Sequence, residues 1–337
     1  MIKTIIKKLL PNRIVIALRI MRYGLNAFPK HDECIEYDAK RFEKYSGCYA
    51  PSNRESLRAQ IIMHYHVIEK GLTMPQRRSG FGVNVLMALM RLVDKYESVF
   101  GSDDPQVMHA ASVVAAYCEL HKSDGEIQEF VMRHKGVGIA KMLHVNEKQL
   151  FANNDSTFPI FAWSRHTVRN YVDKPVPIEL IRKVVDLARS TPSACNRQHC
   201  RVHCISNHET MGRILDLQSG NRGFGHLADK VLIVTADLED TIWKGERCDV
   251  YLEGGMFLMN LCYSLFYYKV GHCILNWFVG GKEDLELRRI VKLKSSETVV
   301  AILSCGFVPD ELYIAASPRK PLSDYLIIHE DENNLVK

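Results

Sequence analysis

Two polar clusters contain the side chains best suited to bind a ligand. The first comprises Arg165, His166, Thr167 and Arg169, and places two guanidinium groups and a hydroxyl within five residues. Arginine offers a planar fork of donors and threonine adds another, so this group can bind a phosphate. The alternative is a solvated basic turn with no ligand.

The second cluster is the loop 192–198, which reads Pro-Ser-Ala-Cys-Asn-Arg-Gln. Small polar side chains of this kind can hydrogen-bond the edge of a flat heterocycle. Ser193 and Asn196 are the candidates, and the alternative is an ordinary loop between a helix and a strand. Between the clusters Pro177 suits a first helical turn, and apolar residues then recur at helical spacing as far as Ala188. We expect the two clusters to face each other across this one predicted helix.

Arg-His-Thr-x-Arg at 165–169, followed by Pro-Ser-x-x-Asn-x-Gln at 192–198, resembles the nitroreductase family of FMN-dependent oxidoreductases. Either half alone would be a weak signal, but both in this order, joined by an amphipathic helix that starts after proline, are fairly specific. The resemblance implies an α+β fold. We expect an α-β-α sandwich with a central mixed or antiparallel sheet, preceded by a mostly helical N-terminal region.

The resemblance also implies FMN as cofactor and NADH or NADPH as reductant. The chemistry would take place on flavin N5, so no catalytic side chain is expected. Arg165, Thr167 and Arg319 would hold the phosphate, although Arg319 could equally be a solvated surface charge. Arg169 would lie near the N1–O2 edge and stabilise the anionic reduced flavin. Ser193 and Asn196 would bind the ring edge, from the same chain or from a partner subunit.

Further flavin contacts follow from matched positions downstream. Asn221 matches an asparagine that touches the flavin ring in the family, with an exposed turn as the alternative. Leu275 and Asn276 would place their backbone near N5 and O4. This sequence departs there from the commoner Pro-x-Gly-Gly pattern. The complete set of cofactor-binding candidates is Arg165, His166, Thr167, Arg169, Pro192, Ser193, Asn196, Asn221, Leu275, Asn276 and Arg319.

Length and charge bound the organisation of the chain. Its 337 residues suggest two domains, and a polar linker near 153–159 predicts a helical extension over 1–155 and an FMN-binding domain over 156–330. The net charge of +5 is mild for this length. With no compact basic helix or aromatic RNA-binding motif, a nucleic-acid partner is not expected.

Ten cysteines occur without a paired framework, which favours a reducing, cytoplasmic compartment. Cys195, Cys200 and Cys204 lie near two histidines, so a metal site has to be considered. A strand after the loop would put Cys200 and Cys204 on one core face. Buried cysteines acting as small hydrophobic side chains are the better interpretation, and no metal site is predicted.

The extension contains a capping-box pattern from Ser52 to Glu55, which predicts a helix reaching Lys70. Inside it, His66 and Glu69 are neighbours and favour a local pair over a metal site. The extension resembles that of nitroreductase-like proteins associated with surface-polysaccharide synthesis, on the basis of His66-x-Ile-Glu-Lys-Gly-Leu and Arg78-x-Gly-Phe-Gly. It could cover the flavin, bind an acidic or phosphorylated substrate through two arginines, or stabilise a dimer.

Two segments raise the question of a membrane. The basic N-terminus, 1–25, could lie on an anionic surface, but packing on its own domain is favoured. The apolar run 251–270 is interrupted by Glu253, Asn260 and Lys269, which predicts a buried central helix rather than a membrane span. By the resemblance, that helix would lie in the core of an intertwined homodimer.

The function that follows is an FMN-dependent oxidoreductase. It would transfer hydride from NAD(P)H through the flavin to a small-molecule acceptor, which is a nitroaromatic, quinone-like or specific biosynthetic compound. The sequence has no Gly-x-Gly-x-x-Gly fingerprint for a separate nicotinamide domain, which fits alternating use of one flavin face. The alternative is a non-redox flavin scaffold or sensor in a surface-polysaccharide pathway.

Overall fold

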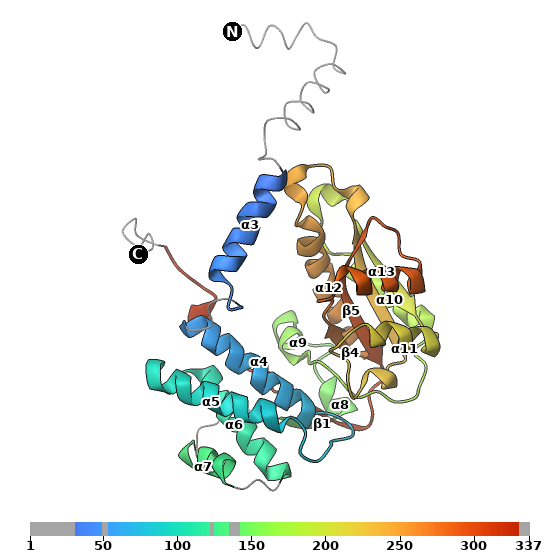
Figure 1. Ribbon diagram of the computed structural model, residues 1–337. Coiled ribbons are helices and arrows are strands. Elements are labelled where there is room, and N and C mark those ends of the chain that lie inside the picture. Colours follow the sequence, from blue (N-terminus) through green and yellow to red (C-terminus); the bar gives the residue numbers. More distant parts are fainter. Residues whose placement is uncertain (1–30, 49–52, 122–124, 135–141, 330–337) are drawn as a thin grey trace, which may run out of the picture.

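The computed structural model describes residues 31–48, 53–121, 125–134 and 142–329. A helical region and a sheet unit lie side by side, with the central strands enclosed by helices (Figure 1). The basic segment 1–25, for which packing on the domain was expected, lies outside the described residues.

The helical region contains α3 (His31–Tyr45), α4 (Arg54–Leu72), α5 (Val83–Phe100), α6 (Pro105–Leu120) and α7 (Glu126–Arg133). Helices α4, α5 and α6 share one apolar core. Asn53 is the N-cap of α4 and its side chain accepts a hydrogen bond from Ser56 N, so the predicted capping box from Ser52 to Glu55 does not start this helix. Gly71 lies inside the last turn, and a glycine is needed there because the ring of Phe81 occupies the space that a Cβ would take.

The sheet unit is built on four antiparallel strands in the order β2-β3-β5-β4. Their bounds are β2 (Cys200–Ile205), β3 (Lys230–Asp237), β4 (Gly271–Leu275) and β5 (Glu297–Gly306). The helices of this unit are α8 (Glu147–Leu150), α9 (Phe158–Ser164), α10 (Ile178–Ala188), α11 (His208–Asp216), α12 (Asp249–Tyr267) and α13 (Gly281–Val291). Short 3-10 helices are η1 (Ala194–Asn196), η2 (Gly225–Leu227), η3 (Leu238–Asp240), η4 (Lys244–Glu246) and η5 (Leu322–Asp324).

Alternation along β3 assigns its side chains to two helical layers. Leu232 and Val234 pack with α10 and α12, whereas Val231 and Ile233 pack with α11 and α13. A strand has a side-chain period of two, so one buried strand serves both layers. The predicted α-β-α sandwich with an antiparallel sheet, preceded by a helical region, is confirmed.

A two-stranded sheet joins the predicted extension to the C-terminal segment. Strand β1 (Leu143–Asn146) pairs antiparallel with β6 (Glu311–Ile314). Leu150 and Phe151 then pack into the core of the sheet unit. Thus the last residues of the predicted extension share the core of the sheet unit, while the 155/156 boundary itself stays a prediction.

Helix α12 departs from the expectation of burial on nearly every side. Phe257 and Leu261 face the sheet, but Leu252, Met256 and Met259 are 64%, 41% and 36% exposed. These three lie at i, i+4 and i+7, so they form one apolar stripe. Within one chain the helix is therefore half-covered. No helix among the described residues is both long and apolar enough to cross a membrane.

Candidate functional site

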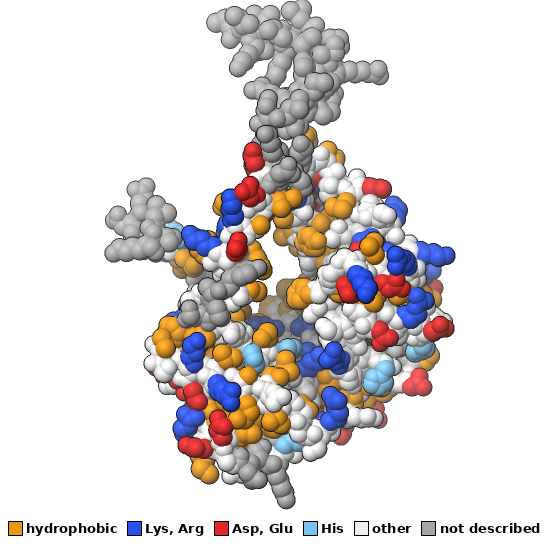
Figure 2. All heavy atoms as spheres, viewed as in Figure 1, with side chains coloured by type: hydrophobic (Ala, Val, Ile, Leu, Met, Phe, Trp, Pro, Cys, Tyr) orange, Lys and Arg blue, Asp and Glu red, His pale blue; other side chains and the backbone are white. Residues whose placement is uncertain are grey.

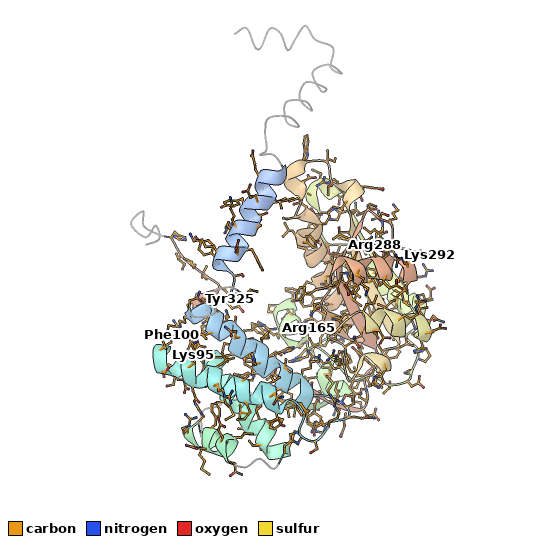
Figure 3. All side chains as sticks on the ribbon, in the orientation of Figure 1. Lys95, Phe100, Arg165, Arg288, Lys292 and Tyr325 are labelled. Atoms are coloured by element: carbon orange, nitrogen blue, oxygen red, sulfur yellow. The ribbon has the colours of Figure 1, made fainter. Side chains whose placement is uncertain are left out.

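The first predicted cluster lies in a cavity where two distant segments meet. Arg165 follows the last residue of α9, and the segment after β6 lies alongside it. Figure 3 shows Arg165 near the centre of the molecule, beside α9. The cavity holds about 320 Å³ and is lined by Trp163, Arg165, His166, Thr167, Ala315, Ala316, Ser317, Pro318 and Arg319. We call it the cation pocket; it unites four of the predicted residues.

The cation pocket gathers positively charged side chains. Among the described residues no carboxylate forms an ion pair with Arg165 or Arg319; Arg319 Nη1 donates to Ser317 O at 2.6 Å. Desolvation, followed by the charges of Arg165 and Arg319, lowers the pKa of His166. Beneath the pocket, burial and Arg165 lower the pKa of His272 to about 4. An anionic ligand would relieve this repulsion.

Arg169 supplies the sharpest sign of a missing partner. Val168 N donates to His272 O at 2.9 Å. This hydrogen bond holds the segment beside β4, and the side chain of Arg169 is directed inward. Arg169 is 8% exposed, and its buried Nε has no hydrogen-bond partner in the described structure. Leaving a buried donor unsatisfied costs about 1–3 kcal/mol. The group fits an acceptor on a bound ligand, as the predicted flavin edge requires.

Two further candidates are joined by Gln218, which the sequence analysis missed. Gln218 Nε2 donates to Asn276 O at 3.1 Å, and Gln218 O accepts from Asn221 Nδ2 at 2.6 Å. The amide nitrogen of Asn221 is thus used within its own loop, and its predicted ring contact would have to come from Oδ1. The Leu275 side chain is buried in the core, so only its backbone can face a ligand.

The loop 192–198 is held in an uncommon backbone conformation. Cys195, Asn196 and Gln198 have φ values of 52°, 56° and 55°, in the left-handed region that non-glycine residues seldom adopt. Glu253 of α12 fixes the turn by accepting from Ala194 N at 2.6 Å. Such strained positions cluster at functional sites when the surrounding structure supports them. From the sequence, Glu253 was only an interruption of an apolar run.

Ion pairs give that support. Arg197 makes a bidentate pair with Glu246 at 2.8 and 2.9 Å. The hydrogen bond from Arg197 lowers the pKa of Glu246 to about 2. Pro192 and Ser193 line a second cavity of about 150 Å³, beside Glu253. The loop therefore sits at the start of α12, away from the cation pocket.

The two predicted clusters do not converge within one chain. At the far end of α12, Phe161 of α9 packs against Phe266 with ring centroids 5.6 Å apart. Arg165 follows α9, whereas the loop 192–198 is attached at Glu253. Residues 253 and 266 are thirteen positions apart on the helix, which is roughly 20 Å along the axis. Within one chain the two clusters are therefore separate, and we call them the two candidate half-sites.

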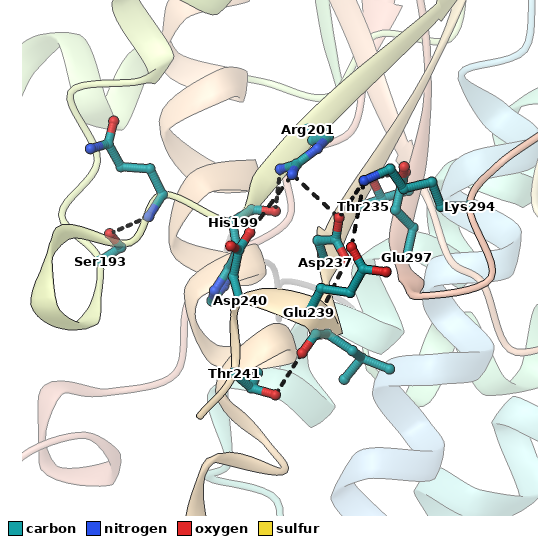
Figure 4. A network of polar contacts seen from close by, with 12 residues as sticks. Ser193, His199, Arg201, Thr235, Asp237, Glu239, Asp240, Thr241, Lys294 and Glu297 are labelled. Carbon is teal, nitrogen blue, oxygen red and sulfur yellow. Dashed lines mark hydrogen bonds and ion pairs between the residues drawn. The ribbon is translucent and has the colours of Figure 1, made fainter. Parts of the chain in front are cut away.

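A third polar cluster is paired within the chain. Glu297 accepts hydrogen bonds from Thr235 at 2.7 Å and pairs with His203 at 2.6 Å. Asp237 of β3 pairs with Arg201 of β2 and with Lys294, which lies shortly before β5 (Figure 4). Because each of these carboxylates is matched by a basic group, the network braces β2, β3 and β5. No group of three or more potential metal ligands occurs in the described part of the chain.

Comparison with known proteins agrees with the family resemblance that the two motifs indicate. Residues 162–221 match the model of the Nitroreductase family, which spans both polar clusters. The resemblance stated from the sequence is therefore confirmed for this segment. A search of the curated proteins gives no match.

Similar solved structures align with about half of the chain. A protein assigned as a nitroreductase, in complex with FMN, from Desulfovibrio desulfuricans shares 18% identity, covers 50% of this chain and 94% of its own, and has a TM-score of 0.43. A nitroreductase family protein from Clostridium difficile shares 20% identity with coverage of 50% and 95% and a TM-score of 0.41. NfrA2 of B. megaterium shares 19% identity with coverage of 52% and 75% and a TM-score of 0.43.

Proposed function

We propose that this protein is an FMN-dependent oxidoreductase that takes reducing equivalents from NADH or NADPH and delivers them to a small-molecule acceptor. The observation that carries the proposal is the cation pocket, where Arg165, Thr167 and Arg319 meet without a carboxylate partner in the described chain. A phosphate supplies the dianion that such a group binds. The match over 162–221 supports the same cofactor.

Each side chain then has a defined task. Arg165, Thr167 and Arg319 hold the phosphate, with His166 in the same cavity. The buried Nε of Arg169 donates to the ring edge where negative charge develops. When bound, FMN supplies the hydride chemistry, and the protein supplies binding, orientation and electrostatics.

The second half-site requires a second copy of the chain. Because the loop 192–198 is attached to α12 at Glu253, whereas the cation pocket follows α9, which packs on α12 at Phe266, we propose a homodimer in which the loop of one copy closes over the pocket of the other. Pro192, Ser193 and Asn196 would then reach the ring edge. The exposed stripe of Leu252 and Met256 supplies the apolar surface that such an interface needs.

The proposed compartment is the cytoplasm. All ten cysteines are free thiols in the structure, which supports a reducing environment. A chain of this size with three apolar core clusters does not need disulfides to stabilise it.

The test is an absorption spectrum of the purified protein before and after anaerobic NADH or NADPH. Flavin bands that bleach on addition of the nicotinamide are the expected result. Bands that persist would refute turnover with these reductants and favour the scaffold or sensor. A protein that neither contains nor binds FMN would overturn the cofactor assignment altogether.

A further inference from the structure

Helix α4 of the helical extension is docked on the candidate site. Glu69 Oε1 accepts from Ser317 N at 3.2 Å, which fixes the segment that lines the cation pocket. One side of the same helix also reaches the C-terminal segment, where Arg58 Nη2 pairs with Asp324 at 2.8 Å. The predicted pairing of His66 with Glu69 is not formed as an ion pair. Glu69 instead lies 3.4 Å from His109, so its carboxylate is already engaged.

Lys70 follows Glu69 and points to the other half of the same site. Its Nζ donates to Gly220 O at 2.6 Å and lies 5.7 Å from the centroid of the Phe224 ring. Lys70 therefore holds the loop that also contains Asn221. The family match begins at residue 162, so this lysine belongs to a part of the chain outside the matched segment.

Lys70 and Arg169 are like charges in one neighbourhood. Desolvation and then Arg169 lower the pKa of Lys70, with a further contribution from Arg222. His66, one turn earlier on α4, has its pKa lowered by desolvation and by Arg169 as well. In Figure 2, Lys, Arg and His side chains gather around the central hollow between the extension and the sheet unit.

The described residues provide no carboxylate that forms an ion pair with Lys70 or Arg169. Two unneutralised cations near each other repel, and the repulsion grows as water is excluded. The phosphate accounts for the charge of Arg165 and Arg319 in the cation pocket. Lys70 and Arg169 lie beside β4 and the 218–225 loop, where the flavin ring was predicted. Their two positive charges would suit a second negatively charged group of the ligand, in addition to the phosphate.

We propose that Lys70 is a ligand-binding residue of the cofactor site, contributed by the helical extension. This inference rests on the proposed function. The ammonium group acts with Arg169 and stabilises the negative charge that the flavin ring gains on two-electron reduction. The extension thereby sets the reduction potential of the cofactor, in addition to covering the site.

Three variants separate charge from structural support. Lys70→Gln removes the charge and keeps a donor for Gly220 O, whereas Lys70→Arg keeps the charge. Lys95→Gln is the control. It removes a lysine charge from an exposed position on α5, in the helical region but away from the candidate site (Figure 3). The dissociation constant for oxidised FMN and the midpoint potential of the bound cofactor are measured for each variant and for the wild type.

We expect Lys70→Gln to weaken binding of the reduced cofactor about tenfold more than that of the oxidised form, which lowers the potential by about 30 mV for a two-electron couple. Lys70→Arg and Lys95→Gln should keep the wild-type potential. A wild-type potential in Lys70→Gln, or equal weakening of both redox forms, overturns this inference while the proposed function stands. A wild-type protein that binds no FMN overturns both.

Discussion

Arg165 and Arg197 carry the same charge in opposite surroundings. Arg165 lines the cation pocket without a carboxylate partner in the described chain, whereas Arg197 is bound by both oxygens of Glu246. The ion pair of Arg197 with Glu246 holds a strained loop in place. The charge of Arg165 remains free for a ligand. The comparison separates a binding group from a bracing group of the same chemical type.

The largest effect should come from separating the two half-sites. Replacing Leu252 and Met256 together by glutamate places two charges in the proposed interface, where burying an unpaired charge is prohibitive. We expect a monomer by light scattering, with weakened FMN binding because the second copy no longer supplies its loop. Met132→Glu, at an exposed position on α7, is the matched control and should leave the assembly unchanged. A double variant that remains dimeric would place the interface elsewhere.

Acid should destabilise the two regions in different pH windows. His272 has a folded-state pKa of about 4, so below about pH 6.5 the unfolded chain binds a proton that the folded chain does not. We expect the free energy of unfolding to fall by about 3 kcal/mol between pH 6.5 and 4 from this group. His66 and His166 act in the same direction.

Glu246 is an acid rather than a base, and its contribution to stability is lost at a lower pH. Its folded-state pKa of about 2 lies below the ordinary value, so its contribution is present above pH 4.5 and is lost as the pH falls towards 2. Urea unfolding at several pH values measures both windows. His272→Gln should make the curve shallower between pH 6.5 and 4 and leave the lower window unchanged. A flat wild-type curve in the upper window would contradict the buried, neutral state of His272.

Arg165→Ala should weaken FMN binding by about 1.5–3 kcal/mol, because it removes a charge-assisted hydrogen bond to the phosphate. The change is measured by titration of flavin fluorescence. Arg182→Ala removes an equal charge from an exposed pair with Glu179 and should leave the affinity unchanged. Equal affinities for the wild type and Arg165→Ala would remove the phosphate from this pocket.

Glu246→Gln should have the smallest effect on FMN binding. It removes the charge from the bidentate contact with Arg197 and should lower the free energy of unfolding by about 1.5–3 kcal/mol. The melting temperature of the FMN-free protein measures this change. A loss of phosphate affinity as large as that of Arg165→Ala would show that the bracing and binding groups are not separate.

Several elements could be predicted because their signals are local. Helix α10 starts after Pro177 as expected, and β2 places Cys200 and Cys204 on one partly buried face. The spacing of Arg165, Thr167 and Arg169 reflects a short segment whose side chains lie close together in any fold. The match of Arg319 to the same pocket came from the family resemblance, since no local pattern links it to residue 165.

Other properties depended on contacts between distant segments. Glu253 read as a break in an apolar run, yet its carboxylate fixes the backbone of Ala194. Gln218 had no signal in the sequence, because its role is to bridge two loops. Lys70 read as the end of a helix, and only the docking of α4 brings it beside Arg169.

The sequence alone determined the residue types of both half-sites, the layered α+β fold and the cofactor class that the motifs imply. Tertiary structure decided that the half-sites stand at opposite ends of α12 and that α12 keeps one apolar stripe exposed. The physical reason is that periodicity and spacing report which face of an element is apolar. They do not report which distant element covers that face, because packing of the whole chain sets those contacts.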